Sequence, residues 1–172
     1  MSLMLTPGAQ VPNLAVETVG GDRWELSAQT PENFTMIVVY RGLHCPVCKS
    51  YLQKLETLLS GYQDGGFSVI ALSMNDKELA EKSASEWELN NLTIGYGLSE
   101  SDARAWGLYI SRAFKEVEAD IFCEPGLFWV RPNGELYLVD VSNMPWARPD
   151  LEFLLSKAAY ALANDYPARG GD

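Results

Sequence analysis

The chain has 172 residues, which is about the length of one domain, so we expect a single domain over residues 1–172. It carries 13 Lys and Arg against 23 Asp and Glu, a formal net charge of −10, and has no basic cluster. Such a chain repels phosphate backbones, and a nucleic acid is not expected as a partner. No run of about eighteen apolar residues occurs, so no membrane-spanning segment is expected either.

The N-terminal end does not resemble a secretory signal, because it has no basic region and is interrupted by Pro7 and Pro12. Residues 1–3, ahead of a second methionine at position 4, are interpreted as an added leader without structural weight. The chain has three cysteines, Cys45, Cys48 and Cys123. An odd, small number without a signal favours reduced thiols in the cytoplasm over a disulfide framework.

Strand and helix patterns alternate along the first half of the chain. Residues 11–26 predict two short strands around a Gly-Gly-Asp turn, and residues 34–40 are apolar on both faces, as in a buried central strand. From Cys48 onward, apolar residues recur in steps of three and four, which predicts a helix closed by Gly65-Gly66. Residues 67–73 predict a second buried strand.

The second half continues the alternation. Asn75, with Glu78 three residues later, predicts a capping box and a helix through about Leu89. The remaining expected elements are a strand at 92–96, a helix at 100–108, a β-hairpin of 127–131 and 135–140 around Asn133-Gly134, an amphipathic helix at 150–163 and a frayed tail at 164–172. Together they predict one α/β domain with a parallel sheet and a hairpin at one side.

The segment Cys45-Pro46-Val47-Cys48 lies where the first buried strand gives way to the following helix. A helix N-terminus carries about half a positive charge and unpaired N–H groups, which favour a thiolate. Arg41, and His44 when protonated, add charge of the same sign, and such settings lower a thiol pKa from ~8.5 to ~3.5–7.5. Because two sulfurs one turn apart can cycle between dithiol and disulfide, we predict a redox-active pair.

Two other interpretations of the cysteine pair stay open. A Cys-x-x-Cys can be half of a zinc site, but the only further soft donors are Cys123 and His44, and His44 adjoins Cys45. Free cysteines can also pack as small apolar side chains, which would make the domain a binding module with structural cysteines. Redox chemistry is the favoured interpretation, with no metal or organic cofactor required.

Residues 38–49 resemble the active-site segment of the thioredoxin superfamily, in which a strand runs into Cys-x-x-Cys-Lys. The closer resemblance is to the peroxiredoxin-like members of the alkyl hydroperoxide reductase/thiol-specific antioxidant family. Their Tyr/Phe-Arg-Gly-x-x-Cys-Pro-x-Cys segment is matched here by Tyr40, Arg41, Gly42, Cys45, Pro46 and Cys48. Residues 124–134 also resemble a strand-turn of that family. The likeness runs from about Val11 to the last helix and implies a thioredoxin-like fold, with a central mixed sheet flanked by helices and an N-terminal β-hairpin.

The resemblance implies two alternative mechanisms. In thioredoxin-like exchange, Cys45 is the exposed nucleophile and Cys48 resolves the mixed disulfide. In typical peroxiredoxins the pattern Pro-x-x-x-Thr-x-x-Cys places the peroxide-attacking cysteine at Cys48, the Thr at Cys45 and the Pro at Arg41. The substrate is then a disulfide or a hydroperoxide, and a thioredoxin- or glutathione-type reductant resets the pair. A homodimer is compatible with this resemblance.

Three residues farther along the chain are further candidates. The catalytic arginine of peroxiredoxins falls at Pro125, where thioredoxins have a cis proline facing the cysteines, so the resemblance implies a cis Glu124–Pro125 bond. Arg148 precedes the last helix, in a loop that approaches the active site in thioredoxin-like folds, and could replace the missing arginine. Cys123 is a weaker candidate for a third thiol, because a buried cysteine at a strand start is the more common situation.

Overall fold

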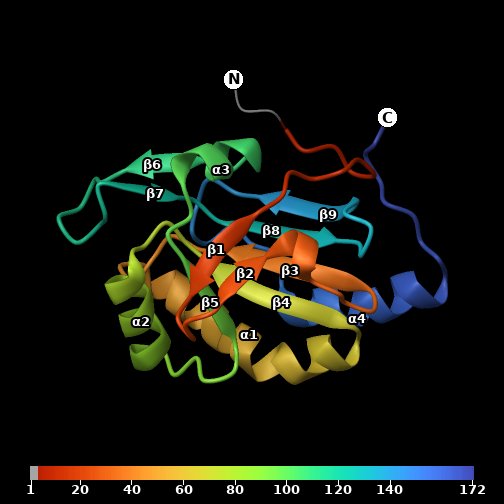
Figure 1. Ribbon diagram of the computed structural model, residues 1–172, viewed down its shortest axis with the longest axis horizontal. Coiled ribbons are helices and arrows are strands. Elements are labelled where there is room, and N and C mark those ends of the chain that lie inside the picture. The colour runs from red at the N-terminus through yellow and green to blue at the C-terminus, as the bar shows by residue number, and fades with distance from the viewer. Residues whose placement is uncertain (1–3) are drawn as a thin grey trace.

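The computed structural model describes residues 4–172, so the interpretation of residues 1–3 as a leader lies outside the described residues. One mixed sheet is built from β1 (Ala15–Thr18), β2 (Arg23–Glu25), β3 (Phe34–Val39), β4 (Phe67–Leu72), β5 (Thr93–Tyr96), β8 (Gly126–Val130) and β9 (Leu136–Val141). The helices are α1 (Pro46–Asp64), α2 (Lys77–Glu86), α3 (Glu100–Ala105) and α4 (Leu151–Ala163), and Leu26–Ala28 forms a 3-10 turn. The strand order is β2-β1-β5-β4-β3-β8-β9 (Figure 1).

The central strand of the sheet is β3, which pairs in parallel with β4 and antiparallel with β8. Every residue of β3 is buried, which confirms the prediction from its two apolar faces. The expected hairpins are also present, since β1 pairs with β2 at one end of the sheet and β8 pairs with β9 at the other. Because α1 follows β3 directly, the sheet presents the start of that helix at the carboxyl end of its central strand.

Each face of the sheet carries its own apolar core. Helices α1, α2 and α4 contribute Leu52, Ala80 and Ala158 to one core, and α3 contributes Ala103 to the other. In Figure 1, α1 and α4 lie below the sheet and α3 lies above it. This arrangement confirms the predicted α/β class with a mixed sheet flanked by helices. Among residues 4–172, no helix is both long and apolar enough to cross a membrane.

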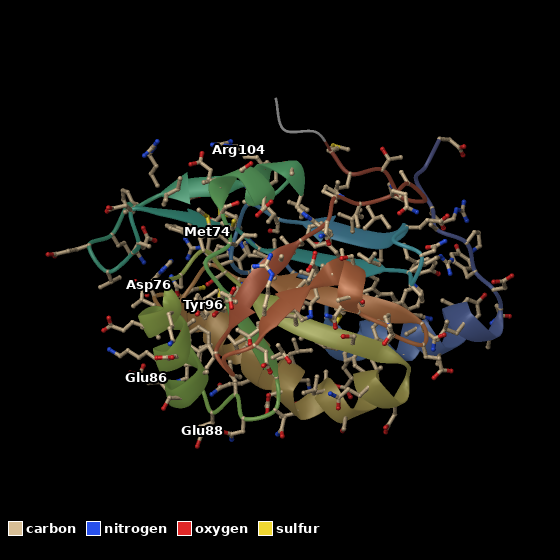
Figure 2. All side chains as sticks on the ribbon, viewed as in Figure 1. Met74, Asp76, Glu86, Glu88, Tyr96 and Arg104 are labelled. Atoms are coloured by element: carbon tan, nitrogen blue, oxygen red, sulfur yellow. The ribbon has the colours of Figure 1, made fainter. Side chains whose placement is uncertain are left out.

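Helix α2 begins and ends differently from the sequence prediction. Its N-cap is Asp76, whose carboxylate accepts the N–H of Leu79 at 3.0 Å, so the assignment of Asn75 as the cap is wrong. Asn75 is buried, and its side-chain oxygen accepts the N–H of Leu43 instead. The helix stops at Glu86 rather than near Leu89, because Glu88 adopts a left-handed conformation with φ of 56°. Figure 2 shows Asp76 and Glu86 at opposite ends of α2.

A second, two-stranded sheet lies outside the main one and was not predicted. It consists of β6 (Ile110–Arg112) and β7 (Ile121–Cys123), paired antiparallel. Figure 1 shows this hairpin projecting beyond the main sheet, over the end where α2 lies. Strands of this length carry too little alternation to be recognised from sequence.

The tail after α4 has no regular secondary structure, but its first part is held against the domain. The hydroxyl of Tyr137 donates to the carbonyl of Tyr166 at 2.8 Å, and the N–H of Tyr166 donates to the carbonyl of Ala161 at 2.9 Å. The tail as far as Tyr166 is therefore anchored to β9 and α4, where the sequence predicted fraying.

Candidate functional site

The cysteine pair occupies the first turn of α1, as the sequence predicted. Cys45 is the N-cap of the helix, and its sulfur accepts the backbone N–H of Cys48 at 3.2 Å. Pro46 follows in the first turn. Backbone N–H groups there have no partner within the helix, so the N–H that proline lacks costs no hydrogen bond. The thiol of Cys45 therefore takes the place that a Ser or Asp side chain usually takes at a helix start.

The loop that leads into this turn depends on one glycine and one buried amide. Gly42 has φ of +137°, and a Cβ added there would meet the side chain of Asn75 at 2.8 Å. That same side chain accepts the N–H of Leu43 at 2.9 Å, and the carbonyl of Asn75 accepts the N–H of Gly97. Only glycine allows this close approach, so Asn75 and Gly42 together set the path of the chain into Cys45.

Arg148 reaches the cysteine pair from the loop between β9 and α4. Its Nη2 donates to the sulfur of Cys48 at 2.8 Å and lies 4.0 Å from the sulfur of Cys45. The guanidinium also stacks over the ring of Tyr51 at 4.9 Å. Its Nε and Nη1 are buried and have no hydrogen-bond partner. The structure thus brings together Arg148 and both cysteines and leaves further donors of Arg148 unused beside them.

Arg41 lies on the other side of the pair and is held by two acidic residues. Its Nε donates to Glu124 at 2.9 Å, and its Nη2 lies 3.5 Å from Glu118. Glu124 is buried and also accepts the hydroxyl of Ser111 at 2.8 Å. The Arg41 guanidinium also lowers the pKa of the Cys45 thiol. The two glutamates and Ser111 were missed from the sequence, because no local spacing relates the β6–β7 hairpin to Arg41.

His44 does not supply the positive charge that the sequence suggested. Burial, and then the neighbouring Arg41, lower the pKa of its imidazole below the ordinary value of 6.5. The ring packs edge-on against Phe122 with centroids 4.7 Å apart, and its Nε2 has no hydrogen-bond partner. These surroundings disfavour the protonated imidazole, on which the expected contribution of positive charge depends.

The two thiols have opposite electrostatic surroundings. A hydrogen bond from the thiol of Cys48 lowers the pKa of Cys45 to about 6, helped by the N–H of Cys48 and by Arg41 and opposed by burial. Burial raises the pKa of Cys48, and its hydrogen bond to Cys45 raises it further. These opposite directions favour a thiolate on Cys45 over a thiolate on Cys48.

Both sulfur residues are much less accessible than the sequence suggested. Cys45 is 1% exposed and Cys48 is fully buried, and both belong to the core under α1. The expectation of an exposed Cys45 is therefore wrong. Both are free thiols in the structure. The charges on either side of them, from Arg41 and Arg148, make this a buried polar site rather than an inert apolar one.

Pro125 and Cys123 are placed differently from the expectations. Among residues 4–172 no peptide bond is cis, so the bond before Pro125 is trans and the cis assignment is wrong. Pro125 still lies near the site, because it lines a small void of about 10 Å³ together with Arg148 and Tyr51. Cys123 packs in the core on the opposite face of the sheet, where burial raises its pKa to about 12. It does not join the pair as a third thiol.

A cavity of about 260 Å³ lies beside Arg148, and neither cysteine lines it. It is lined by Val47 from the first turn of α1, by Tyr51 one turn later, and by Trp146 and Arg148 from the β9–α4 loop. Arg148 thus borders both this cavity and the sulfur of Cys48. A small molecule in this cavity would contact Arg148, which in turn contacts the sulfur of Cys48.

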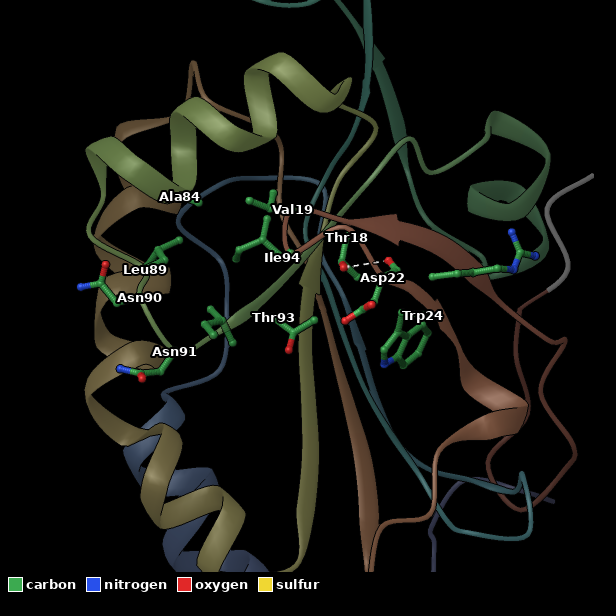
Figure 3. Close-up of a pocket in the computed structure, with 13 residues that line it drawn as sticks. Thr18, Val19, Asp22, Trp24, Ala84, Leu89, Asn90, Asn91, Thr93 and Ile94 are labelled. Atoms are coloured by element: carbon green, nitrogen blue, oxygen red, sulfur yellow. Dashed lines mark hydrogen bonds between the residues drawn. The ribbon is translucent and has the colours of Figure 1, made fainter.

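A larger hollow of about 460 Å³ lies elsewhere, between the β1–β2 turn and the segment that joins α2 to β5. Figure 3 shows Thr18, Asp22 and Asn91 around it, with the hydroxyl of Thr18 donating to the carbonyl of Asp22 at 2.8 Å. None of the candidate residues lines this hollow. Within residues 4–172, no cluster of three or more His, Cys, Asp or Glu side chains is placed to hold a metal ion.

Comparison with known proteins gives a family and a fold. A sequence model of the AhpC/TSA family matches residues 7–139. Comparison with curated protein sequences gave no match.

Among solved structures, a peroxiredoxin-like protein from Aquifex aeolicus is 16% identical with a TM-score of 0.73, covering 92% of this chain and 88% of that chain. Peroxiredoxin 6 of Arenicola marina is 15% identical with a TM-score of 0.76, covering 94% of this chain and 76% of that chain. Peroxidoxin BcpB from Mycobacterium tuberculosis is 14% identical with a TM-score of 0.69, covering 93% and 97%. These likenesses confirm the thioredoxin-like fold.

Proposed function

Since this chain belongs to the AhpC/TSA family and is an enzyme of thiol redox chemistry, we propose that it reduces hydroperoxides through its Cys45–Cys48 pair. Membership of the family sets aside the alternative of a binding module with structural cysteines. The observation that carries the proposal is the geometry of the pair: the sulfur of Cys45 accepts the N–H of Cys48 at the helix start, Arg148 donates to the sulfur of Cys48 at 2.8 Å, and two further nitrogens of Arg148 have no hydrogen-bond partner.

In the first step, the Cys45 thiolate attacks the terminal oxygen of the hydroperoxide. A sulfur–oxygen bond forms, the oxygen–oxygen bond breaks, and Cys45 becomes a sulfenic acid. The leaving oxygen departs as an alkoxide or hydroxide and takes a proton from solvent. The unpartnered N–H groups of Arg148 stabilise the negative charge that develops on that oxygen.

In the second step, the sulfur of Cys48 attacks the sulfur of Cys45. The new disulfide forms as the sulfur–oxygen bond breaks, and the departing hydroxide leaves as water with the proton from Cys48. Two thiols are oxidised and one hydroperoxide is reduced to an alcohol, or to water, together with one water. A thioredoxin- or glutathione-type dithiol or thiol restores the pair by exchange.

The burial of the sulfurs favours a hydroperoxide over a protein disulfide as substrate. In the reduced state Cys45 is only 1% exposed, and a substrate disulfide would have to bring two sulfurs into line with its thiolate, which demands more space than a hydroperoxide does. A hydroperoxide presents a single small oxygen to the thiolate. The cavity of about 260 Å³ beside Arg148 can accept the rest of such a molecule.

The proposal is tested by trapping sulfenic acid with dimedone after one equivalent of hydrogen peroxide, in a Cys123→Ser background. Cys48→Ser retains the proposed nucleophile and lacks the resolving thiol, so we expect it to accumulate the adduct at Cys45. Cys45→Ser, its matched control, is expected to form none. An adduct in Cys45→Ser with none in Cys48→Ser would assign the attack to Cys48. Absence of peroxide consumption by the native chain, together with turnover of insulin disulfides, would replace the peroxidase proposal with disulfide exchange.

A further inference from the structure

A groove on the α4 side of the sheet, away from the cysteines, has the properties of a ligand site. Its volume is about 640 Å³, within the ~300–1,000 Å³ typical of small-molecule pockets. We define it as the α4 groove, lined chiefly by Trp129, Tyr137, Leu154, Lys157, Tyr160 and Arg169. Its walls come from β8 and β9, from α4 and from the C-terminal tail.

The tail forms a structured wall of this groove. The hydroxyl of Tyr137 holds the carbonyl of Tyr166, and Arg169 donates to the hydroxyl of Tyr166 at 3.2 Å. Pro7, from the N-terminal segment, lines the same groove. Figure 1 shows the tail running up from α4 to the C-terminus. The C-terminal tail and the N-terminal segment therefore complete a groove whose other walls are core elements.

The charged side chains that line the groove are positive, although the net charge of the chain is negative. The net charge of the chain is −10, yet the charged residues of the lining are Lys157 and Arg169, with no Asp or Glu. Within residues 4–172 neither of them forms an ion pair. Lys157 lies over the rings of Phe153 and Tyr160 at 5.3 and 5.8 Å, and Arg169 contacts Tyr166. Two cations without carboxylate partners, above an aromatic floor, complement an anion with an apolar body.

From this complementarity we propose that the α4 groove binds an amphipathic organic anion, namely a carboxylate that carries an apolar or aromatic body. The body lies against Trp129, Tyr137 and Leu154, and the carboxylate lies between Lys157 and Arg169. The proposal does not depend on the redox function, because no cysteine lines the groove.

The test is isothermal titration of the reduced, full-length chain with octanoate, and with octan-1-ol as the uncharged analogue. We expect octanoate to bind one site per chain. The double variant Lys157→Gln/Arg169→Gln weakens octanoate binding by about 3–10-fold, as expected for two exposed ion pairs, and leaves octan-1-ol unchanged. The matched control Lys77→Gln/Lys82→Gln removes two cations from α2 and leaves both affinities unchanged. Ala161→Phe fills the groove and abolishes both.

Three results would overturn the proposal. Octanoate could fail to bind, it could bind the Lys157/Arg169 double variant as tightly as the native chain, or the α2 control could weaken it equally. Sedimentation velocity gives a further check on the occupant. If the native chain is a dimer that Ala161→Phe converts to a monomer, a second copy covers the groove and the small-molecule proposal falls.

Discussion

Two arginines flank the same pair of thiols, and their surroundings differ. Arg41 is bound by Glu124 and lies near Glu118, so its positive charge is more than balanced by carboxylates. Arg148 forms no ion pair within residues 4–172, and two of its nitrogens have no hydrogen-bond partner. A guanidinium that is held and balanced by carboxylates can orient a thiolate. A guanidinium with unpartnered N–H groups can also stabilise negative charge that develops on a substrate oxygen. We infer that Arg41 sets the resting state of Cys45 and that Arg148 acts during the reaction.

The largest effect on the rate of peroxide reduction is expected from removing the unpartnered N–H donors of Arg148. Arg148→Gln should lower kcat/KM for hydrogen peroxide by about 10²-fold or more across the whole pH range, because charge stabilisation in the transition state is lost. Arg148→Lys keeps the positive charge but loses the planar, forked set of guanidinium donors. Its kcat/KM should therefore lie between that of Arg148→Gln and that of the native chain. Peroxide consumption followed at several pH values measures this. Equal rates in Arg148→Gln and the native chain would remove Arg148 from the mechanism.

A smaller, pH-dependent effect is expected from the anchored arginine. The native rate should rise with pH through the Cys45 pKa of about 6 and level off above it, because only the thiolate attacks. Arg41→Gln removes a hydrogen bond to that thiolate and should raise its pKa. With a rise of about one unit, the rate below pH 6 drops about tenfold while the rate at pH 8.5 stays near the native one.

The control for Arg41 is Arg23→Gln, which breaks an exposed ion pair with Glu17 on the β1–β2 hairpin. Its pH profile should match the native one. Thiolate absorbance near 240 nm gives the Cys45 pKa independently of turnover. An Arg41→Gln protein with the native pKa but a lower rate at every pH would show that Arg41, like Arg148, acts in the transition state.

The smallest effect is expected at His44. Burial and Arg41 lower its pKa, which disfavours the charged imidazole, so we expect it to add little to the field at the thiolate. His44→Gln should therefore change kcat/KM at pH 7 by less than about twofold. A loss of tenfold or more at pH 7, with the fold intact by circular dichroism, would restore His44 as a source of positive charge.

Local patterns in the sequence were sufficient for most of the framework. The apolar run of β3, the helical stripe after Cys48 and the Asn-Gly turn each carry their signal within a few residues, and each element is present. The start of α2 shows the limit of this approach. Asn75 and Asp76 are both good N-caps by sequence, and only the bond from Leu43 to Asn75, across 32 residues, leaves the cap to Asp76.

The sequence by itself determined that two cysteines start a helix directly after a buried strand, because strand, turn and helix signals are local there. It also pointed to Arg41, which lies just before the cysteines, and, through the resemblance to thioredoxin-like folds, to Arg148 in the loop before the last helix. Only the tertiary structure decided that Glu124 and Glu118 hold Arg41, that burial lowers the pKa of His44 and that the sulfurs are buried. These properties depend on desolvation and on contacts between distant segments. The spacing of residues along the chain predicts neither the desolvation nor the contacts.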